Sequence, residues 1–130
     1  MTEEEFLARL PLDLSPQQRA AVCAAGGPVL LLAVPGSGKT TVLVARLGCL
    51  IHCRGVSPSE ILTVTYTVSA AGDMARRFAA LFGDDLARQL SFRTINGLCA
   101  SIIHTYARWK GSEPFALADS EAQLNAVLRD

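Results

Sequence analysis

The sequence predicts an α/β fold in which helices cover a mainly parallel sheet. Two short apolar runs, residues 28–34 and 61–67, are typical of parallel strands covered on both faces. Each is followed by a stretch in which apolar residues recur with helical spacing. Because strand and helix alternate with short turns, we expect right-handed crossovers on a parallel sheet.

Composition limits the class of protein without naming a partner. The 130 residues are 50% hydrophobic and 18% charged, which suits one domain with its own core. Twelve basic residues balance twelve acidic ones, so net charge alone does not predict a nucleic-acid partner. No long apolar run is present, and the first five residues are acidic where a secretory signal would be basic. We therefore expect a cytoplasmic protein with no membrane partner.

Capping signals place two short helices before the first strand. Thr2 and Glu5 have the spacing of a capping box for a helix that runs to residue 10. Ser15 and Pro16 suit the N-cap and first position of a second helix, which extends to about residue 25 before two glycines.

The remaining elements follow from periodicity and turn residues. A helix is expected over 39–53, with five residues facing inward: Val42, Leu43, Leu47, Leu50 and Ile51. Ser69 is the predicted N-cap of a helix over 70–81. A weaker strand at 90–93 leads to Thr94, a predicted N-cap for a helix over 95–109. A loop at 111–114 and a last helix over 119–130 complete the prediction.

The four cysteines lie in apolar stretches and lack the paired spacing of a zinc site. We interpret them as buried thiols. Cys49 and Cys53 are four residues apart with His52 between them, so a helix would put both sulfurs on one face. That spacing permits a metal or redox role.

The strongest functional signal directly follows the first predicted strand. Residues 33–40 match the phosphate-binding P-loop pattern GxxxxGK[ST], except that Ala33 replaces the first glycine. Gly36 and Gly38 permit a backbone path that turns amide hydrogens toward phosphate oxygens. Lys39 supplies a cation for the β- and γ-phosphates, and the Thr40 hydroxyl is placed to coordinate Mg²⁺. The predicted phosphate-site residues are Ala33, Val34, Pro35, Gly36, Ser37, Gly38, Lys39, Thr40 and Thr41.

A P-loop is shared by ATPases, GTPases and small-molecule kinases. Hydrolysis also needs an acidic Mg²⁺ partner at the end of a second apolar strand, and the sequence has none in that context. Asp73, Asp84 and Asp85 lie within or at the end of predicted helices. We therefore expect this sequence to belong to a longer protein in which that strand follows.

Three further motifs resemble those of superfamily 1 DNA helicases of the UvrD/Rep type, from Leu14 onward. Residues 14–22 are similar to the Q motif of that family, which implies that Gln18 hydrogen-bonds the adenine edge. Without the resemblance, Gln18 would be an exposed polar residue on an amphipathic helix.

Residues 63–67 resemble motif Ia, which contacts single-stranded DNA in the family. The resemblance implies that Thr65 and Thr67 donate to phosphates and that Tyr66 stacks on a base. Val68 and Ser69 stand where the family usually has Asn-Lys. Taken alone, the stretch would be an ordinary core strand.

Residues 92–99 are similar to motif Ib. Thr94 and Asn96 fall at its DNA-facing positions, with Asn96 in place of the usual His and Ile95 in place of the usual aromatic residue. Helix capping by Thr94 is compatible with that role.

The resemblance implies an ATP-dependent DNA helicase with a P-loop NTPase (RecA-like), three-layer α/β/α fold, incomplete in this chain. Lys39 and Thr40 would be its catalytic residues here, and ATP and Mg²⁺ its cofactors. The implied partner is single-stranded DNA, or duplex with a single-stranded tail. Residues 1–13 would form an N-terminal extension, 14–118 the first part of the motor domain, and 119–130 the start of an inserted helical subdomain.

Two alternatives stay open: a free-standing P-loop nucleotide-binding module and a small P-loop kinase. If the helicase assignment holds, the chain alone should hydrolyse little ATP, because the acidic motif and the arginine fingers lie elsewhere in the family. Strand edges and apolar surface left uncovered should make it self-associate.

Overall fold

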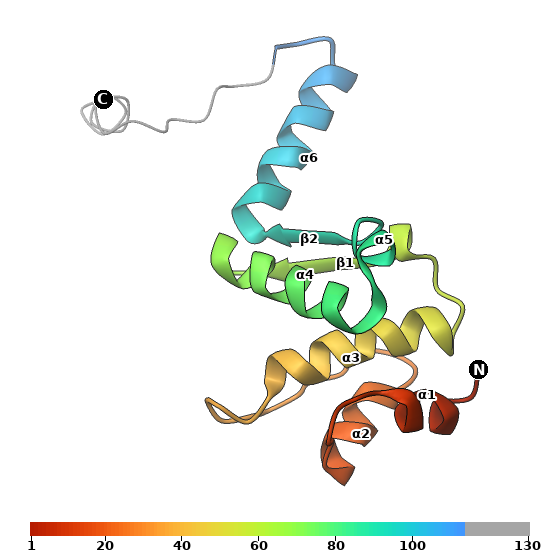
Figure 1. Ribbon diagram of the computed structural model, residues 1–130. Coiled ribbons are helices and arrows are strands. Elements are labelled where there is room, and N and C mark those ends of the chain that lie inside the picture. Colours follow the sequence, from red (N-terminus) through yellow and green to blue (C-terminus); the bar gives the residue numbers. More distant parts are fainter. Residues whose placement is uncertain (114–130) are drawn as a thin grey trace. The chain divides into compact units, whose positions relative to one another are not determined.

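A computed structural model describes residues 1–113 (Figure 1). The elements are α1 (Glu3–Arg9), α2 (Pro16–Cys23), α3 (Lys39–His52), a 3-10 turn η1 (Pro58–Glu60), β1 (Leu62–Thr65), α4 (Val68–Phe82), α5 (Asp84–Ala87), β2 (Ser91–Thr94) and α6 (Ile95–Trp109). The chain divides into two units, Met1–Ile95 and Asn96–Asp130, which we describe separately. The predicted helix over 119–130 and the end of the predicted loop, Pro114, lie outside the described residues.

Helix α3 supplies side chains to both hydrophobic clusters of the first unit. One face, with Val42, Ala45 and Cys49, packs against α1 and α2 around Phe6 and Val22. Val44 and Leu47 pack against Met74, Phe78 and the residues around β1 and β2. Because apolar residues surround so much of α3, it is the central helix of this unit, as Figure 1 shows.

The first two helices begin at the capping boxes that the sequence predicts. The Glu5 amide donates to the Thr2 hydroxyl at 3.2 Å, and the Thr2 amide donates to the Glu5 carboxylate at 3.0 Å. The same reciprocal pair joins Ser15 and Gln18 at the start of α2. Each pair satisfies amide groups that a helix N-terminus otherwise leaves without partners.

The predicted parallel sheet is confirmed as a pair of strands. β1 and β2 are parallel, and Thr65 lies opposite Thr94 at their carboxyl ends. The connection between them runs through α4, which contacts both strands. The chain is thus a mixed helix and strand structure with a small parallel sheet.

The predicted strand over 28–34 is wrong for this structure. The segment forms no strand, and β1 and β2 pair only with each other in the described part of the chain. Leu31 contacts the cluster around α3, whereas Leu30 and Leu32 are each 82% exposed. A strand requires a hydrogen-bonded neighbour, which residue type and hydrophobicity cannot supply by themselves.

Two smaller predictions also need correction. Thr67, not Ser69, is the N-cap of α4, since its hydroxyl accepts from the Ala70 amide at 3.1 Å and α4 already begins at Val68. Leu43, predicted to face inward, is exposed, while its neighbours Val42 and Val44 are buried on two sides of α3.

The described part of the second unit is helix α6 and the turn after it. The helix is confirmed over the predicted residues, and Ala107 is its buried residue. The helix ends at Gly111, whose φ of 69° turns the chain back. This turn lets the Ser112 amide donate to the Ala107 carbonyl at 2.9 Å. Among the residues that the structure describes, no helix has the length and apolar character needed to cross a membrane.

Gly48 lies where α3 meets the ring of Phe82. A Cβ atom at Gly48 would lie 2.2 Å from Phe82 Cζ, and that ring is flanked by Phe6 and Phe78 at centroid distances of 6.1 and 4.8 Å. We expect Gly48→Ala to lower the free energy of unfolding by about 1–3 kcal/mol through overpacking. Urea titration followed by circular dichroism measures the change.

Gly72 in α4 is the matched control, because the nearest atom to its added Cβ is Arg76 Nη1 at 3.8 Å. Gly72→Ala should raise the free energy of unfolding by about 0.5–1 kcal/mol through improved helix propensity. Equal effects of the two substitutions would contradict the assigned packing.

The exposed apolar side chains of residues 28–34 generate a prediction about association. Leu30 and Leu32 together with Leu62 and Val64 of β1, which are 49% and 42% exposed, leave apolar surface in contact with water. We expect the 130-residue chain to self-associate, and the Leu30→Lys, Leu32→Lys double variant to do so less. Light scattering over a range of concentrations measures this, and a monomeric wild-type chain at every concentration would refute it.

Candidate functional site

The P-loop forms a tight turn between the extended segment and α3. Gly36 and Gly38 have φ values of 81° and 79°, which L side chains rarely adopt. The Ser37 amide and hydroxyl both donate to the Val34 carbonyl, at 3.2 and 2.7 Å. The two glycines and this pair of bonds fix the path of the loop.

Lys39 is the first residue of α3, and its side chain folds back onto the loop. Its ammonium donates to the carbonyls of Ala33 and Val34, at 3.2 and 2.9 Å. An ammonium has three donors, so one remains for another acceptor. The loop carbonyls thus hold a positive charge beside the start of α3.

The N-terminus of α3 differs from those of α1, α2 and α4. Side chains of Thr2, Ser15 and Thr67 cap α1, α2 and α4. Gly38 is the N-cap of α3, and no side chain from the described residues accepts its first amides. The first four amides of a helix lack intrahelical partners, and the helix dipole makes that end positive. The start of α3 therefore suits an anion.

Thr40 and Thr41 lie in the first turn of α3 and are half-buried. Thr41 lines a separate cavity of about 200 Å³, together with Leu12 and residues of α4 that include Leu81. The hydroxyl of Thr40 follows Lys39 directly, at the offset that the P-loop pattern requires for a magnesium ligand.

Gln18 connects the start of α2 to the P-loop. Its Oε1 accepts from the Ser15 amide at 2.8 Å, and its Nε2 donates to the Ser37 carbonyl at 3.0 Å. A side-chain amide has two donor hydrogens and two acceptor lone pairs. One donor and one acceptor site of Gln18 are therefore still available, which is the pair that an adenine edge can use.

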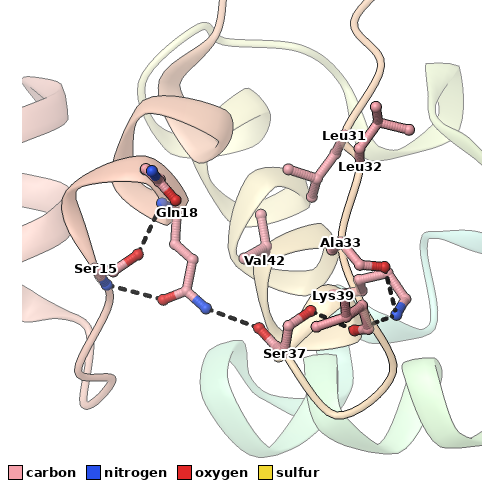
Figure 2. Close-up of a pocket in the computed structure, with 10 residues that line it drawn as sticks. Ser15, Gln18, Leu31, Leu32, Ala33, Ser37, Lys39 and Val42 are labelled. Atoms are coloured by element: carbon pink, nitrogen blue, oxygen red, sulfur yellow. Dashed lines mark hydrogen bonds between the residues drawn. The ribbon is translucent and has the colours of Figure 1, made fainter.

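One cavity of about 330 Å³ brings together five of the ten predicted adenine and phosphate residues: Gln18 of α2 with Ala33, Val34, Ser37 and Lys39 of the loop (Figure 2). The other five, Pro35, Gly36, Gly38, Thr40 and Thr41, do not line it. The sequence did not predict the other five wall residues as part of a site, although Ser15 was identified as a helix cap and Val42 as a core residue: Ser15, Gln17, Leu31, Leu32 and Val42. Ser15 and Gln17 could have been predicted as wall residues from their proximity to Gln18 in the sequence.

Arg46 of α3 holds α2 in the position that brings Gln18 to the loop. Its Nη1 donates to the carbonyls of Ala21, Val22 and Ala24, at 3.0, 3.3 and 2.7 Å. These carbonyls belong to the end of α2, where a helix leaves acceptors without intrahelical partners. This role of Arg46 could not be predicted from the sequence, because helical periodicity does not show which distant carbonyls a side chain will contact.

Of the predicted DNA-contacting residues, Thr65, Tyr66, Thr67 and Thr94 gather at the carboxyl ends of β1 and β2. Tyr66 is 88% exposed. The Thr65 hydroxyl donates to the Thr67 carbonyl at 3.0 Å, so its hydrogen is already engaged. The Thr67 hydroxyl accepts from the Ala70 amide and therefore keeps its own hydrogen for another acceptor.

Asn96 belongs to the second unit, where it is exposed in the first turn of α6. Its predicted role and the N-cap role of Thr94 stay predictions. Asp73 is confirmed within a helix, where it pairs with Arg76 and Arg77 at 3.2 and 2.7 Å. Asp84 and Asp85, predicted at the end of that helix, instead begin the separate helix α5.

Comparison with known proteins identifies close relatives of the chain. A family model described as the UvrD/REP helicase N-terminal domain matches residues 14–130. The ATP-dependent DNA helicase UvrD1 of Mycobacterium leprae is 43% identical over 127 residues, which cover 94% of this chain and 16% of the relative. The ATP-dependent DNA helicase PcrA of Leuconostoc citreum is 36% identical over 114 residues, which cover 87% of this chain and 15% of the relative.

A probable DNA helicase II homolog of Rickettsia felis is 41% identical over 90 residues, or 69% of this chain and 13% of the relative. The chain thus spans 16% of the length of the Mycobacterium leprae protein and less of the other two.

Proposed function

The chain belongs to the UvrD/REP helicase N-terminal domain family, and from that membership we propose that it supplies nucleotide-binding groups to an ATP-dependent DNA helicase. That protein would couple ATP hydrolysis to translocation on single-stranded DNA and to unwinding of duplex. The observation that carries the proposal is the uncapped start of α3, which shares one cavity with Lys39 and Gln18.

The phosphate chain of ATP would bind at the start of α3. Its oxygens would accept from the uncapped amides and compete with the carbonyls of Ala33 and Val34 for the Lys39 ammonium. The ammonium would then stabilise negative charge on the γ-phosphoryl group. Thr40 would hold Mg²⁺, which supplies further positive charge between the β- and γ-phosphates.

Gln18 would recognise adenine with its remaining donor and acceptor, while its other two bonds hold it against Ser15 and Ser37. A residue fixed in this way loses little conformational entropy on binding. Since the same amide touches the carbonyl of Ser37, a change in the loop upon phosphate binding would reach the base-recognising group directly.

Single-stranded DNA would bind across the carboxyl ends of β1 and β2. Tyr66 would stack on a base, and Thr67 would donate to a phosphate beside the positive end of α4. Thr65 would have to release the Thr67 carbonyl before it could donate to DNA. Thr94 and Asn96 would add contacts to the bound DNA strand.

We extend the proposal to the architecture of the whole protein. Residues 14–118 would form the first part of a RecA-like, three-layer motor domain, with 1–13 as an extension and 119–130 leading into an inserted subdomain. The acidic magnesium ligand and the arginine fingers would come from other parts of that protein. The 130-residue chain should therefore hydrolyse little ATP.

The second candidate is a free-standing P-loop nucleotide-binding module. It is favoured by the single cavity that already holds Lys39 and Gln18 within the first unit. Adenine specificity separates the candidates, because a phosphate site alone does not distinguish bases.

Titration of a fluorescent ATP analogue with Mg²⁺ tests the nucleotide site. Lys39→Ala should weaken binding about tenfold to a hundredfold, since a charge-assisted bond contributes roughly 1.5–3 kcal/mol. Gln18→Glu preserves the acceptor for the Ser15 amide but removes the donor, so binding should weaken while α2 stays intact. Unlabelled GTP should displace the analogue poorly.

Gln17→Ala is the matched control, because Gln17 lines the same cavity and lies beside Gln18 in α2. Circular dichroism of each variant establishes that the helices persist. If the analogue bound Gln18→Glu as tightly as the wild type and GTP displaced it readily, adenine recognition would be rejected. That result would favour the free-standing module.

A second titration tests DNA binding. Anisotropy of a labelled oligothymidylate should show that Tyr66→Ala weakens binding by about 1–3 kcal/mol, whereas Tyr66→Phe retains it, because stacking needs only the ring. Trp109→Ala, an exposed aromatic in the second unit, is the control. If Tyr66→Phe and Tyr66→Ala weakened binding equally, base stacking by Tyr66 would be excluded.

A further inference from the structure

Three helix ends meet at a cluster of metal-ligating side chains remote from the P-loop sequence. Glu3 is the first residue of α1, Cys23 the last of α2, and Cys49 lies in the final turn of α3. One carboxylate oxygen and the two sulfurs all lie within 4.8 Å of one another. The carboxylate and the two thiols come from three separate helices, so the packing of these helices against one another brings them together.

Cys53 extends the cluster by one more sulfur. It follows Cys49 by four residues, and its thiol donates to the Thr2 carbonyl at 3.6 Å, next to Glu3. The donor atoms of Glu3, Cys23 and Cys49 are the three that already lie close together. Cys53, one helical turn after Cys49, is the neighbouring residue that can supply the fourth ligand of a tetrahedral site.

Charged and polar groups around the cluster orient it. The Arg54 guanidinium pairs with the Glu3 carboxylate and donates to the Cys23 carbonyl at 3.2 Å. Ligating carboxylates in metal sites are commonly held by such a second hydrogen bond.

The cluster is compatible with the hydrophobic core when no ion is bound. Burial, and then the neighbouring Cys53 and Cys23, raises the pKa of the Cys49 thiol to about 12. Burial likewise raises the pKa of Cys23. Both thiols are thus neutral at pH 7, and Cys49 packs as a small apolar residue beside Ala45 and Val22.

We propose that Glu3, Cys23, Cys49 and Cys53 bind a thiophilic divalent cation of the Zn²⁺ class, which joins α1, α2 and α3. Thiolate ligands select such ions over Mg²⁺, so this site is chemically distinct from the nucleotide site. Zn–S bonds of about 2.3 Å place sulfurs about 3.8 Å apart, so the donors of Glu3, Cys23 and Cys49 would draw together by up to about 1 Å. The Cys53 thiol would leave the Thr2 carbonyl to join them. Each coordinating thiol would release its proton to solvent as its sulfur–metal bond forms.

Cadmium titration of the full 130-residue chain, reduced with a phosphine and freed of metal, tests the proposal. The ultraviolet thiolate-to-cadmium absorption band should saturate at one equivalent, and Zn²⁺ but not Mg²⁺ should abolish it. Cys23→Ser and Cys49→Ser should weaken cadmium binding at least about tenfold, and Glu3→Gln should weaken it to a smaller extent. Metal binding should also raise the melting temperature of the wild-type chain.

Cys99→Ser is the matched control, since Cys99 is exposed in the second unit, contrary to the predicted burial of all four thiols. Cys23 is only half-buried, so Cys23→Ser tests the site even if Cys49→Ser fails to fold. The proposal is overturned by a folded, reduced wild-type chain without the band, or by a Cys23→Ser chain that binds cadmium as tightly as the wild type. A disulfide among these cysteines, with no metal binding after its reduction, would also overturn it.

Discussion

The docking of α2 on α3 is the constraint on which the candidate nucleotide site depends. Arg46 of α3 satisfies three carbonyls at the end of α2, while Val22 packs against the face of α3 that carries Val42 and Cys49. These contacts place Gln18, near the start of α2, within 3.0 Å of the Ser37 carbonyl. Contacts within the protein therefore hold Gln18 against the loop without any contribution from a nucleotide.

Some polar groups in the first unit are used in capping helices, whereas others remain able to bind a ligand. The hydroxyls of Thr2 and Ser15 accept from helix amides, and Thr67 caps α4 with its oxygen alone. At the start of α3, Gly38 has no side chain with which to cap the helix. Glycine therefore serves two purposes there, since it permits the positive φ of 79° and leaves the first amides open to an anion.

Local chemistry was the part of the fold that sequence could predict. Capping boxes, the P-loop pattern and helical periodicity depend on residues a few positions apart, and α1, α2, α3 and α6 lie close to the predicted bounds. The segment 28–34 was predicted wrongly because strand formation depends on a distant partner for its backbone groups. The roles of Arg46 and Leu31, and the approach of Glu3 and Cys23 to Cys49, were not predicted for the same reason, since the partners lie on other elements. Capping by Ser69 failed because Thr67 offered the helix an earlier cap.

Helix α3 joins the two candidate sites and also limits how they can influence each other. Lys39 and Cys49 are ten residues apart in this helix, so their backbones are about 15 Å apart. Charges separated by that distance are largely screened at physiological salt, where the Debye length is about 8 Å. Direct electrostatic coupling between a cation at Cys49 and phosphates at Lys39 would therefore be small. The remaining route is mechanical, because Cys23 ends the same short helix that carries Gln18. An ion that drew Cys23 toward Cys49 would tighten the docking of α2 on α3, and with it the position of the amide that faces the loop.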